Sequence, residues 1–187
     1  EGLSIYKFSN NTWQQTGDPF LADSNYPNFG AFVSLSEDGN TLAVASGGRV
    51  AGTIYVKDIE VRTYKYIDGS WNQIYRDNGY LDFDHNDDPS GFNYMSRITD
   101  ITLSSDGKWL AYGGFHQDDI TGAVDIYEFQ NNQWVLNGIL SKEESDFLYR
   151  GDTVDLEGFI SLDFSSDGKI LAVGDNDRTC LLYTSDA

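Results

Sequence analysis

The sequence predicts an all-β fold assembled from repeated four-stranded antiparallel sheets, and two blocks that recur along the chain support this prediction. The first block, Ser-x-Asp-Gly-x-x-Leu-Ala, occurs in residues 32–46, 100–114 and 161–175. The second block has three copies, in residues 3–13, 61–71 and 124–134, which align without gaps and carry a Tyr and a Trp at the same positions. Repeats of this length, somewhat above the roughly 40 to 50 residues of common propeller units, are typical of propellers and solenoids.

The first block is predicted to form a β-hairpin. Val33 and Leu35 alternate with small or polar residues before the turn, and Leu42 and Val44 do so after it. Alternation with a period of two indicates a strand. The Asp-Gly pair between the two runs supplies the positive φ that a tight turn needs.

The second block is also predicted to form a hairpin. Its three copies turn at Asn10-Asn11, Asp68-Gly69 and Asn131-Asn132. These residue types tolerate the left-handed region of φ/ψ space. No segment combines a 3.6-residue apolar period with helix caps, so helix is expected to be minor. Each repeat therefore supplies four strands, here called a to d in chain order.

A propeller blade is the repeat unit that these features favour. In residues 124–129, Val124 and Ile126 point to one face of the predicted strand, and Tyr127 and Phe129 point to the other. A sheet with two apolar faces must pack against neighbours on both sides. A β-sandwich would show one polar face, although a sandwich or a stacked solenoid stays an alternative.

Counting strands predicts a fragment of a propeller in residues 1–179, with two full blades and two half blades. The segments expected are strands c and d in residues 1–16, blades in 29–76 and 97–138, and strands a and b in 158–179. A closed propeller needs at least about four blades. We therefore expect unpaired strand edges and apolar blade faces on the isolated chain, and association or insolubility as a result.

Residues 180–187 are expected to be a non-native tail. CLLYTSDA is identical to the translation of a common transposon-based sequencing adapter. On this interpretation Cys180, the single cysteine of the chain, does not belong to the natural protein. The alternative is that Thr179 to Tyr183 form a genuine strand c.

The repeats resemble the FG-GAP propeller repeats of integrin α-chains. The resemblance rests on Phe29-Gly30 ahead of the first Asp-Gly hairpin and on the second block after it. Arg97-Ile98 and Gly158-Phe159 replace Phe-Gly in the other copies. The Ser-Ser-Asp-Gly-Lys core is equally similar to WD-repeat and TolB-like propellers. The resemblance implies a propeller that binds a protein or glycan ligand.

Charge and hydropathy exclude some classes of partner. The 187 residues contain 12 basic and 30 acidic side chains, for a net charge of −18. Such a chain repels nucleic acid and anionic lipid. No apolar span is long enough to predict membrane insertion. A secreted or cell-surface location is what the integrin-like resemblance favours.

The best candidate for a metal site is the loop of residues 81–91. Asp82, Asp84, Asn86 and Asp88 alternate as oxygen donors and resemble the calcium loops of integrin propellers. Calcium prefers six to eight hard oxygen ligands on a flexible turn. Asp87 stands where such loops carry a glycine, so an acidic solvated loop is the alternative. Residues 151–158, with Asp152, Asp155 and Glu157, are a weaker candidate.

Two function classes follow. The first is a non-enzymatic interaction or adhesion module, stabilised by calcium and extracellular, and this is the class we favour. The second is a fragment of a propeller hydrolase or lyase, whose catalytic residues would project from the strands a. These strands offer Asp100 and Asp163 without a recurring acid, base and nucleophile set. Arg150-Gly151-Asp152 matches an adhesion tripeptide, but three such residues also arise by chance. The Tyr and Trp residues at matched positions of the second block are expected to pack between blades.

Overall fold

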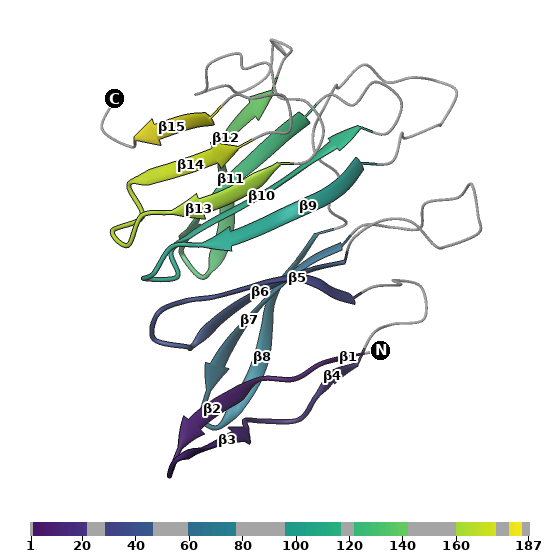
Figure 1. Ribbon diagram of the computed structural model, residues 1–187, viewed down its shortest axis with the longest axis vertical. Helices are drawn as coiled ribbons and strands as arrows, with labels where there is room; N and C mark the ends of the chain where they lie inside the picture. Colours follow the sequence, from purple (N-terminus) through teal and green to yellow (C-terminus); the bar gives the residue numbers. More distant parts are fainter. Residues whose placement is uncertain are drawn as a thin grey trace, which may run out of the picture.

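The structure is a computed structural model that describes residues 2–21, 29–46, 60–77, 96–116, 122–141, 160–174 and 180–184. All of the regular elements in these ranges are strands, and no helix occurs among them (Figure 1). The described part therefore contains no helix that is long and apolar enough to cross a membrane. The predicted all-β fold class is confirmed.

The N-terminal hairpin comprises residues 2–21. Its strands are β1 (Gly2–Leu3), β2 (Tyr6–Ser9), β3 (Thr12–Gln15) and β4 (Phe20–Leu21), with β1 paired to β4 and β2 paired to β3. Asn10 and Asn11, at φ of 51° and 61°, make the turn that the sequence predicts.

Two four-stranded antiparallel sheets follow, each in sequential strand order. The first sheet contains β5 (Phe29–Leu35), β6 (Thr41–Ser46), β7 (Glu60–Ile67) and β8 (Ser70–Asp77). The second sheet contains β9 (Ser96–Leu103), β10 (Trp109–His116), β11 (Gly122–Gln130) and β12 (Gln133–Ser141). In the first sheet the register between the third and fourth strands shifts at Thr63/Tyr64, and in the second sheet it shifts at Ile126/Tyr127. The two sheets therefore share a β-bulge at equivalent positions of the repeat.

The third sheet has three described strands. They are β13 (Ser161–Phe164), β14 (Ile170–Gly174) and β15 (Cys180–Thr184), in that order. Strand β15 pairs antiparallel with β14 along its length. The adapter origin of residues 180–187 concerns the gene rather than the fold and stays a prediction.

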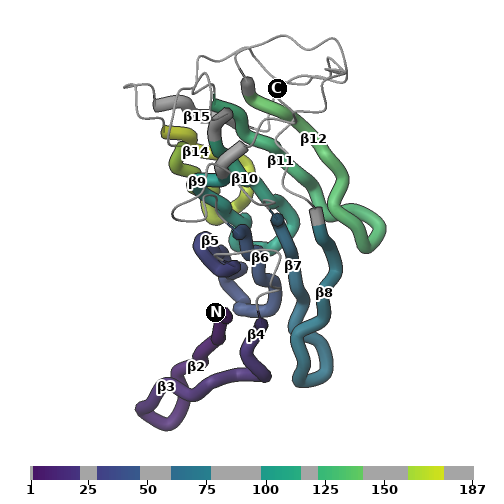
Figure 2. The backbone as a smooth tube through the Cα atoms, turned by 90° about the vertical axis from the view of Figure 1, so that its right-hand side faces the viewer, coloured from purple at the N-terminus to yellow at the C-terminus, as the bar shows by residue number. Residues whose placement is uncertain are grey.

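The sheets stack face to face in an open arc that does not close into a ring (Figures 1 and 2). The N-terminal hairpin lies at one end and the third sheet at the other, and the innermost strands β5, β9 and β13 contact one another in succession. A hydrophobic cluster fills each space between layers. Val61, Leu103, Tyr112, Tyr127 and Trp134 belong to the cluster between the first and second sheets.

The two faces of β11 pack as the sequence predicts. Val124 and Ile126 join the cluster that faces the third sheet, whereas Tyr127 and Phe129 join the cluster that faces the first sheet. Burial on both faces is what distinguishes a blade from a sandwich strand.

The matched aromatic residues differ in burial from one copy to the next. Tyr64, Tyr127 and Trp134 are buried, as predicted, but Tyr6 and Trp13 are 55% and 66% exposed. The difference arises because the N-terminal hairpin has no sheet on its outer side among the described residues. The prediction of a packing role is therefore wrong for this copy.

Candidate functional site

The predicted calcium ligands Asp82, Asp84, Asn86 and Asp88 lie outside the described residues. The second acidic loop, 151–158, and the Arg-Gly-Asp tripeptide at 150–152 lie outside them too. Within the ranges that the structure describes, no group of three or more His, Cys, Asp or Glu side chains could hold a metal ion. The calcium site stays a prediction.

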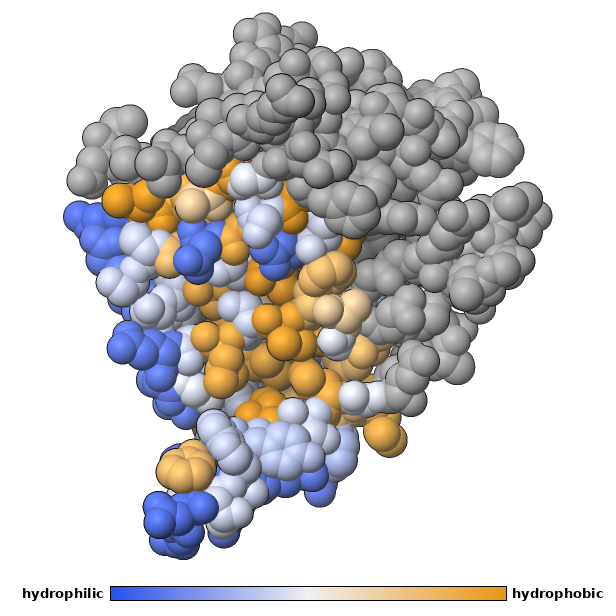
Figure 3. All heavy atoms as spheres, in the orientation of Figure 1, coloured by the Kyte–Doolittle hydropathy of each residue, from blue (hydrophilic) through white to orange (hydrophobic). Residues whose placement is uncertain are grey.

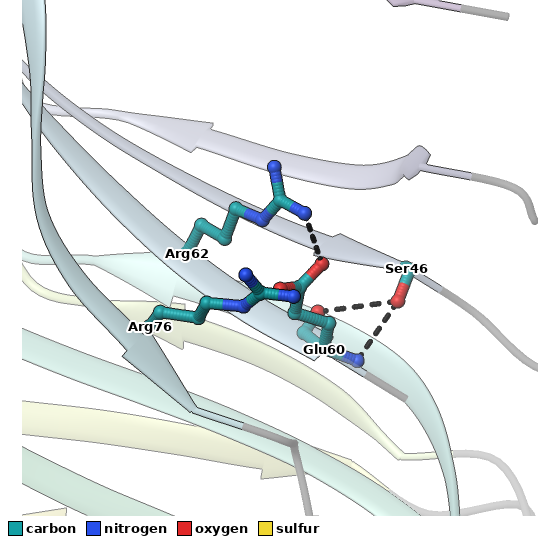
Figure 4. Close-up of polar contacts among 4 residues, drawn as sticks. All are labelled: Ser46, Glu60, Arg62 and Arg76. Atoms are coloured by element: carbon teal, nitrogen blue, oxygen red, sulfur yellow. Dashed lines mark hydrogen bonds and ion pairs between the residues drawn. The ribbon is translucent and has the colours of Figure 1, made fainter. Parts of the chain in front are cut away.

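The most conspicuous polar site that the structure does describe is an ion-pair cluster made by Ser46, Glu60, Arg62 and Arg76 (Figure 4). The Glu60 carboxylate is fully buried, and Arg62 Nη2 lies 2.6 Å from its Oε2 atom. Arg76 Nε contacts the other carboxylate oxygen, Oε1. One carboxylate is thus held between two guanidinium groups.

The strand register explains how residues far apart in sequence form this cluster. Glu60 and Arg62 alternate on β7 and so point to the same face, toward the N-terminal hairpin. Arg76 on β8 lies directly opposite Arg62 in the antiparallel pair. Directly opposed residues share a face of a sheet, and the two arginines therefore converge on Glu60.

Neighbouring groups hold both ends of the cluster. Ser46, at the end of β6, accepts a hydrogen bond of 2.8 Å from the main-chain N–H of Glu60. The Arg62 guanidinium lies 4.9 Å from the centre of the Phe29 ring, which is a cation–π contact. The cluster therefore ties the end of β6 to the start of β7.

The surroundings shift two pKa values. Burial lowers the pKa of Arg62, but contacts with Glu60 and Tyr64 raise it by more, so that it lies above its ordinary value. Burial is also the main cause that raises the pKa of Tyr64. Arg62 thus stays charged throughout the pH range of folded proteins, and Tyr64 stays neutral.

This arrangement is suited to clamping backbone and unsuited to acid–base chemistry. A general base must reach the proton that it abstracts, but the Glu60 carboxylate is fully buried and each of its oxygens faces a guanidinium group. Arg76 is the one member that reaches solvent substantially, with 42% of its side chain exposed. Sequence analysis missed this cluster. The signal available was the charged pair Glu60 and Arg62 at alternate positions of a buried strand. Their partner Arg76 on β8 could be identified only once the register of β7 and β8 was known.

Of the two acids on the innermost strands, Asp100 has structural partners. Asp100 Oδ1 accepts a hydrogen bond from the N–H of Ile101 at 2.9 Å, and its Oδ2 accepts one from the N–H of Leu162 at 2.7 Å. Asp100 thus joins β9 to β13. Asp163 is exposed on β13. Neither residue is accompanied by a nucleophile and base set within the described ranges.

The three Asp-Gly turns share one hydrogen-bond pattern. In the first, Ser36 Oγ donates to Asp38 Oδ1 at 2.6 Å and accepts from Thr41 N at 2.9 Å. Ser104 with Asp106 and Ser165 with Asp167 repeat the pattern. Their glycines all have positive φ, as predicted. These residues are turn formers, and the geometry gives them no catalytic role.

Comparison with known proteins agrees with the repeat architecture. A family model described as WD domain, G-beta repeat, matches residues 153–184. This chain is a propeller-repeat protein. Its four-stranded antiparallel sheets and the WD match together support this description, and the match does not extend to FG-GAP repeats. No curated protein matches the chain.

Solved structures with a similar arrangement include three peptidases. The chain is similar to Porphyromonas gingivalis dipeptidyl peptidase 4 at 13% identity and a TM-score of 0.48, over 98% of this chain and 28% of that one. It is similar to Galerina marginata prolyl oligopeptidase B at 14% identity and a TM-score of 0.35, over 75% of this chain and 17% of that one. A prolyl endopeptidase is 13% identical, with a TM-score of 0.28, over 93% of this chain and 32% of that one. The chain spans less than a third of each length, and no assignment rests on these likenesses.

Proposed function

We propose that this chain is a non-enzymatic protein-interaction module carried on propeller blades. The observation that supports this most strongly is that the carboxylates of Glu60 and Asp100 serve as scaffold. Glu60 is held by two arginines, and Asp100 accepts main-chain hydrogen bonds from two strands. A catalytic acid or base must instead be able to reach its substrate. Both carboxylates thus make structural contacts where a catalytic acid or base would have to meet its substrate.

The WD match supports a protein as the partner. WD repeats typically mediate contacts between proteins, and the match covers residues 153–184. A rigid stack of sheets is well suited to this task, because contact residues at its rim are positioned before the partner arrives.

We place the contact at the rim where β6 ends and β7 begins. Residues 47–59 connect these strands, whereas the shorter segment 117–121 connects the equivalent strands β10 and β11. Ser46 and Glu60 pair directly across the base of the longer connection. The ion-pair cluster therefore fixes the base of the longest connection between a second and a third strand in the two complete sheets.

The charge of the chain favours a basic partner. A net charge of −18 attracts a positively charged protein over several ångströms and speeds its encounter. Salt screens this attraction over a Debye length of about 8 Å at physiological ionic strength. The affinity for the partner should therefore fall as salt is added.

Selection from a displayed library of random peptides tests the proposal. The full chain is the bait, and the matched control is a chain in which residues 47–59 are replaced by the sequence of residues 117–121. We expect peptides rich in Lys and Arg to be enriched on the full chain and lost on the control, with both chains melting cooperatively. No enrichment, or equal enrichment on both folded chains, would contradict the proposal.

The finer features of the proposal are adhesion at the cell surface and calcium binding at Asp82, Asp84, Asn86 and Asp88. The Phe29-Gly30 resemblance to integrin-type repeats and the alternating oxygen donors support them. Isothermal titration of the full chain with calcium chloride tests the metal site. We expect binding that is lost when Asp82 and Asp84 are changed to Asn and kept when Asp18 is. No heat at millimolar calcium would contradict it.

A further inference from the structure

The first sheet has exposed apolar residues at positions where the equivalent residues of the second sheet are buried. Ile101 and Leu103 on β9 are only 3% and 6% exposed, because the first sheet packs on them. Val33 and Leu35 hold the same positions on β5 and are 49% and 46% exposed. Figure 3 shows hydrophobic side chains gathered over the place where Figure 1 draws β5.

The Asp-Gly turn of the first sheet is open in the same way. A Cβ atom on Gly107 would stand 2.8 Å from Thr41 Oγ1 of the first sheet, and one on Gly168 would stand 3.0 Å from Trp109 Cδ1 of the second. Each of these turns rests on the sheet before it. A Cβ atom on Gly39, the matching residue of the first sheet, would have no atom of the described residues within 4 Å.

The third sheet is open on its opposite face. A Cβ atom on Gly113 of β10 would stand 2.9 Å from Ile160 Cγ2, which packs on the second sheet from the third. Gly174 holds the same position on β14, and a Cβ atom there would have no neighbour within 4 Å in the part of the chain that the structure describes. Ala111 is fully buried by the same contact, whereas the matching Ala172 is only partly buried. The third sheet thus repeats the face on which a next sheet would pack.

Polar groups on the two open faces also match. The N–H of Leu103 donates a hydrogen bond of 2.9 Å to Ser34 Oγ across the first two sheets. Asp163 holds the position of Ser34 on the third sheet, and its carboxylate can accept such a bond. Leu35 holds the position of Leu103 and offers the main-chain N–H.

The N-terminal hairpin covers part of the first sheet but leaves Val33 and Leu35 exposed. Leu3, Ile5 and Phe20 of the hairpin pack against a cluster that includes Leu42 and Tyr64. By the alignment of the repeats the hairpin corresponds to a third and a fourth strand. The strands needed over Val33 and Leu35 are therefore a first and a second strand, the kind that β13 and β14 supply.

We propose that the open face of the first sheet binds β13 and β14 of a second copy of this chain, so that these strands and the N-terminal hairpin complete one blade between two copies. The contact is heterologous, because the two copies contribute different faces. It repeats the interface that joins the first, second and third sheets within the chain. Strand β15 occupies the edge of β14 that the hairpin needs, so residues 180–187 compete with the association.

Sedimentation velocity of the full chain over a wide range of concentration tests the proposal, in about 0.15 M salt to screen the like charges of the copies. We expect association that rises with concentration and becomes tighter when residues 180–187 are removed. Leu35→Lys on one face should weaken it by roughly tenfold or more, since an unpaired ammonium group would enter an apolar contact. Gly174→Phe on the other face should do the same by filling the space of the incoming strand. Leu136→Lys, at a 41% exposed position on the outer strand β12, is the matched control.

Mixing the two blocked variants gives the decisive readout. Leu35→Lys keeps an intact third sheet and Gly174→Phe keeps an intact first sheet, so an equimolar mixture should form one-to-one dimers and nothing larger. Circular dichroism and thermal melting check that each variant is folded. Monomers at every concentration for both the full and the shortened chain would overturn the proposal. Association that neither substitution weakens, or blocked variants that stay monomeric when mixed, would overturn it as well.

Discussion

A Cβ atom built on Gly107 would stand 2.8 Å from Oγ1 of Thr41, so the second Asp-Gly turn lies directly against the first sheet. The glycine therefore serves two purposes. It adopts a φ of 65°, which a residue with a side chain enters only at a cost, and it lets two sheets approach closely.

Alanine at Gly107 should destabilise the chain more than alanine at Gly39. Both residues have positive φ, so both variants incur strain of about 1 to 2 kcal/mol. Only the methyl group at position 107 would also overlap Thr41, which adds roughly 1 to 3 kcal/mol. Urea unfolding of both variants at dilute chain concentration measures the difference. Equal losses would contradict close packing at Gly107.

Removing the carboxylate of Glu60 should be among the most costly single changes. Glu60→Ala leaves Arg62, whose side chain is 11% exposed, without its countercharge. Breaking a buried ion pair from one side costs about 3 to 5 kcal/mol. Glu37→Ala, at an exposed position in the first turn, is the control and should change the unfolding free energy little. If both variants unfold at the same urea concentration, the cluster does not clamp β6 to β7.

The hydrogen bond between Trp134 and Thr63 should contribute measurably to the stacking of the first two sheets. Trp134 Nε1 donates to Thr63 Oγ1 at 2.8 Å in the buried interface. Thr63→Val keeps the shape of the side chain and leaves the indole N–H without this acceptor, at a cost of about 1 to 3 kcal/mol. Thr12→Val on an exposed strand is the matched control. Chemical denaturation of the pair gives the difference, and no excess loss for Thr63→Val would argue against the bond.

Acid should weaken the chain through its three Asp-Gly turns. Hydrogen bonds from Ser36 and from the N–H of Asn40 lower the pKa of Asp38 below its usual 3.8. Burial raises the pKa of Asp106, but hydrogen bonds from Ser104 and Lys108 lower it by more, so the net shift is downward. Hydrogen bonds from Ser165 and Lys169 likewise lower the pKa of Asp167. A carboxyl group whose pKa is lower in the folded state stabilises the fold at pH values above its unfolded-state pKa. This stabilisation is lost as the pH falls through the folded-state pKa.

Unfolding free energies from pH 7 downward measure this effect. The decline should begin near the unfolded pKa, at about pH 4, and continue below it. A chain carrying Ser36→Ala, Ser104→Ala and Ser165→Ala should show a shallower decline than the parent chain. An identical acid dependence for the two chains would show that the serines do not set these pKa values.

The turns of this fold could be predicted from sequence because the information is local. Asn131 and Asn132 have φ of 50° and 66°, and their side-chain chemistry alone indicates a left-handed turn. The contact of Gly107 with Thr41 could not be predicted in this way, since it depends on how one sheet sits on another. The repeat itself contained a hint, because small residues recur on the second strand at Ala43, Ala111 and Ala172.

The polar site was beyond local reasoning for a similar reason. Glu60 and Arg76 are on different strands, and only the register of β7 and β8 brings the arginine onto the same face. Equivalent positions in the repeat also diverge. Trp134 has Thr63 as its acceptor, whereas Ile5 stands where an acceptor for Trp71 would be, and the buried Trp71 Nε1 has none among the described residues.

Native-state hydrogen exchange followed by NMR tests most directly the central claim, that the sheets stack through their innermost strands and that the first sheet has an open place in this stack. The N–H groups of Leu103 and Leu162 bond to Ser34 and Asp100 of the preceding sheets at 2.9 and 2.7 Å. At dilute chain concentration we expect both amides to be strongly protected and the matching amide of Leu35 to exchange quickly, with Ser34→Ala removing protection at Leu103 alone. Rapid exchange at Leu103 and Leu162, or equal protection of all three amides, would contradict the account.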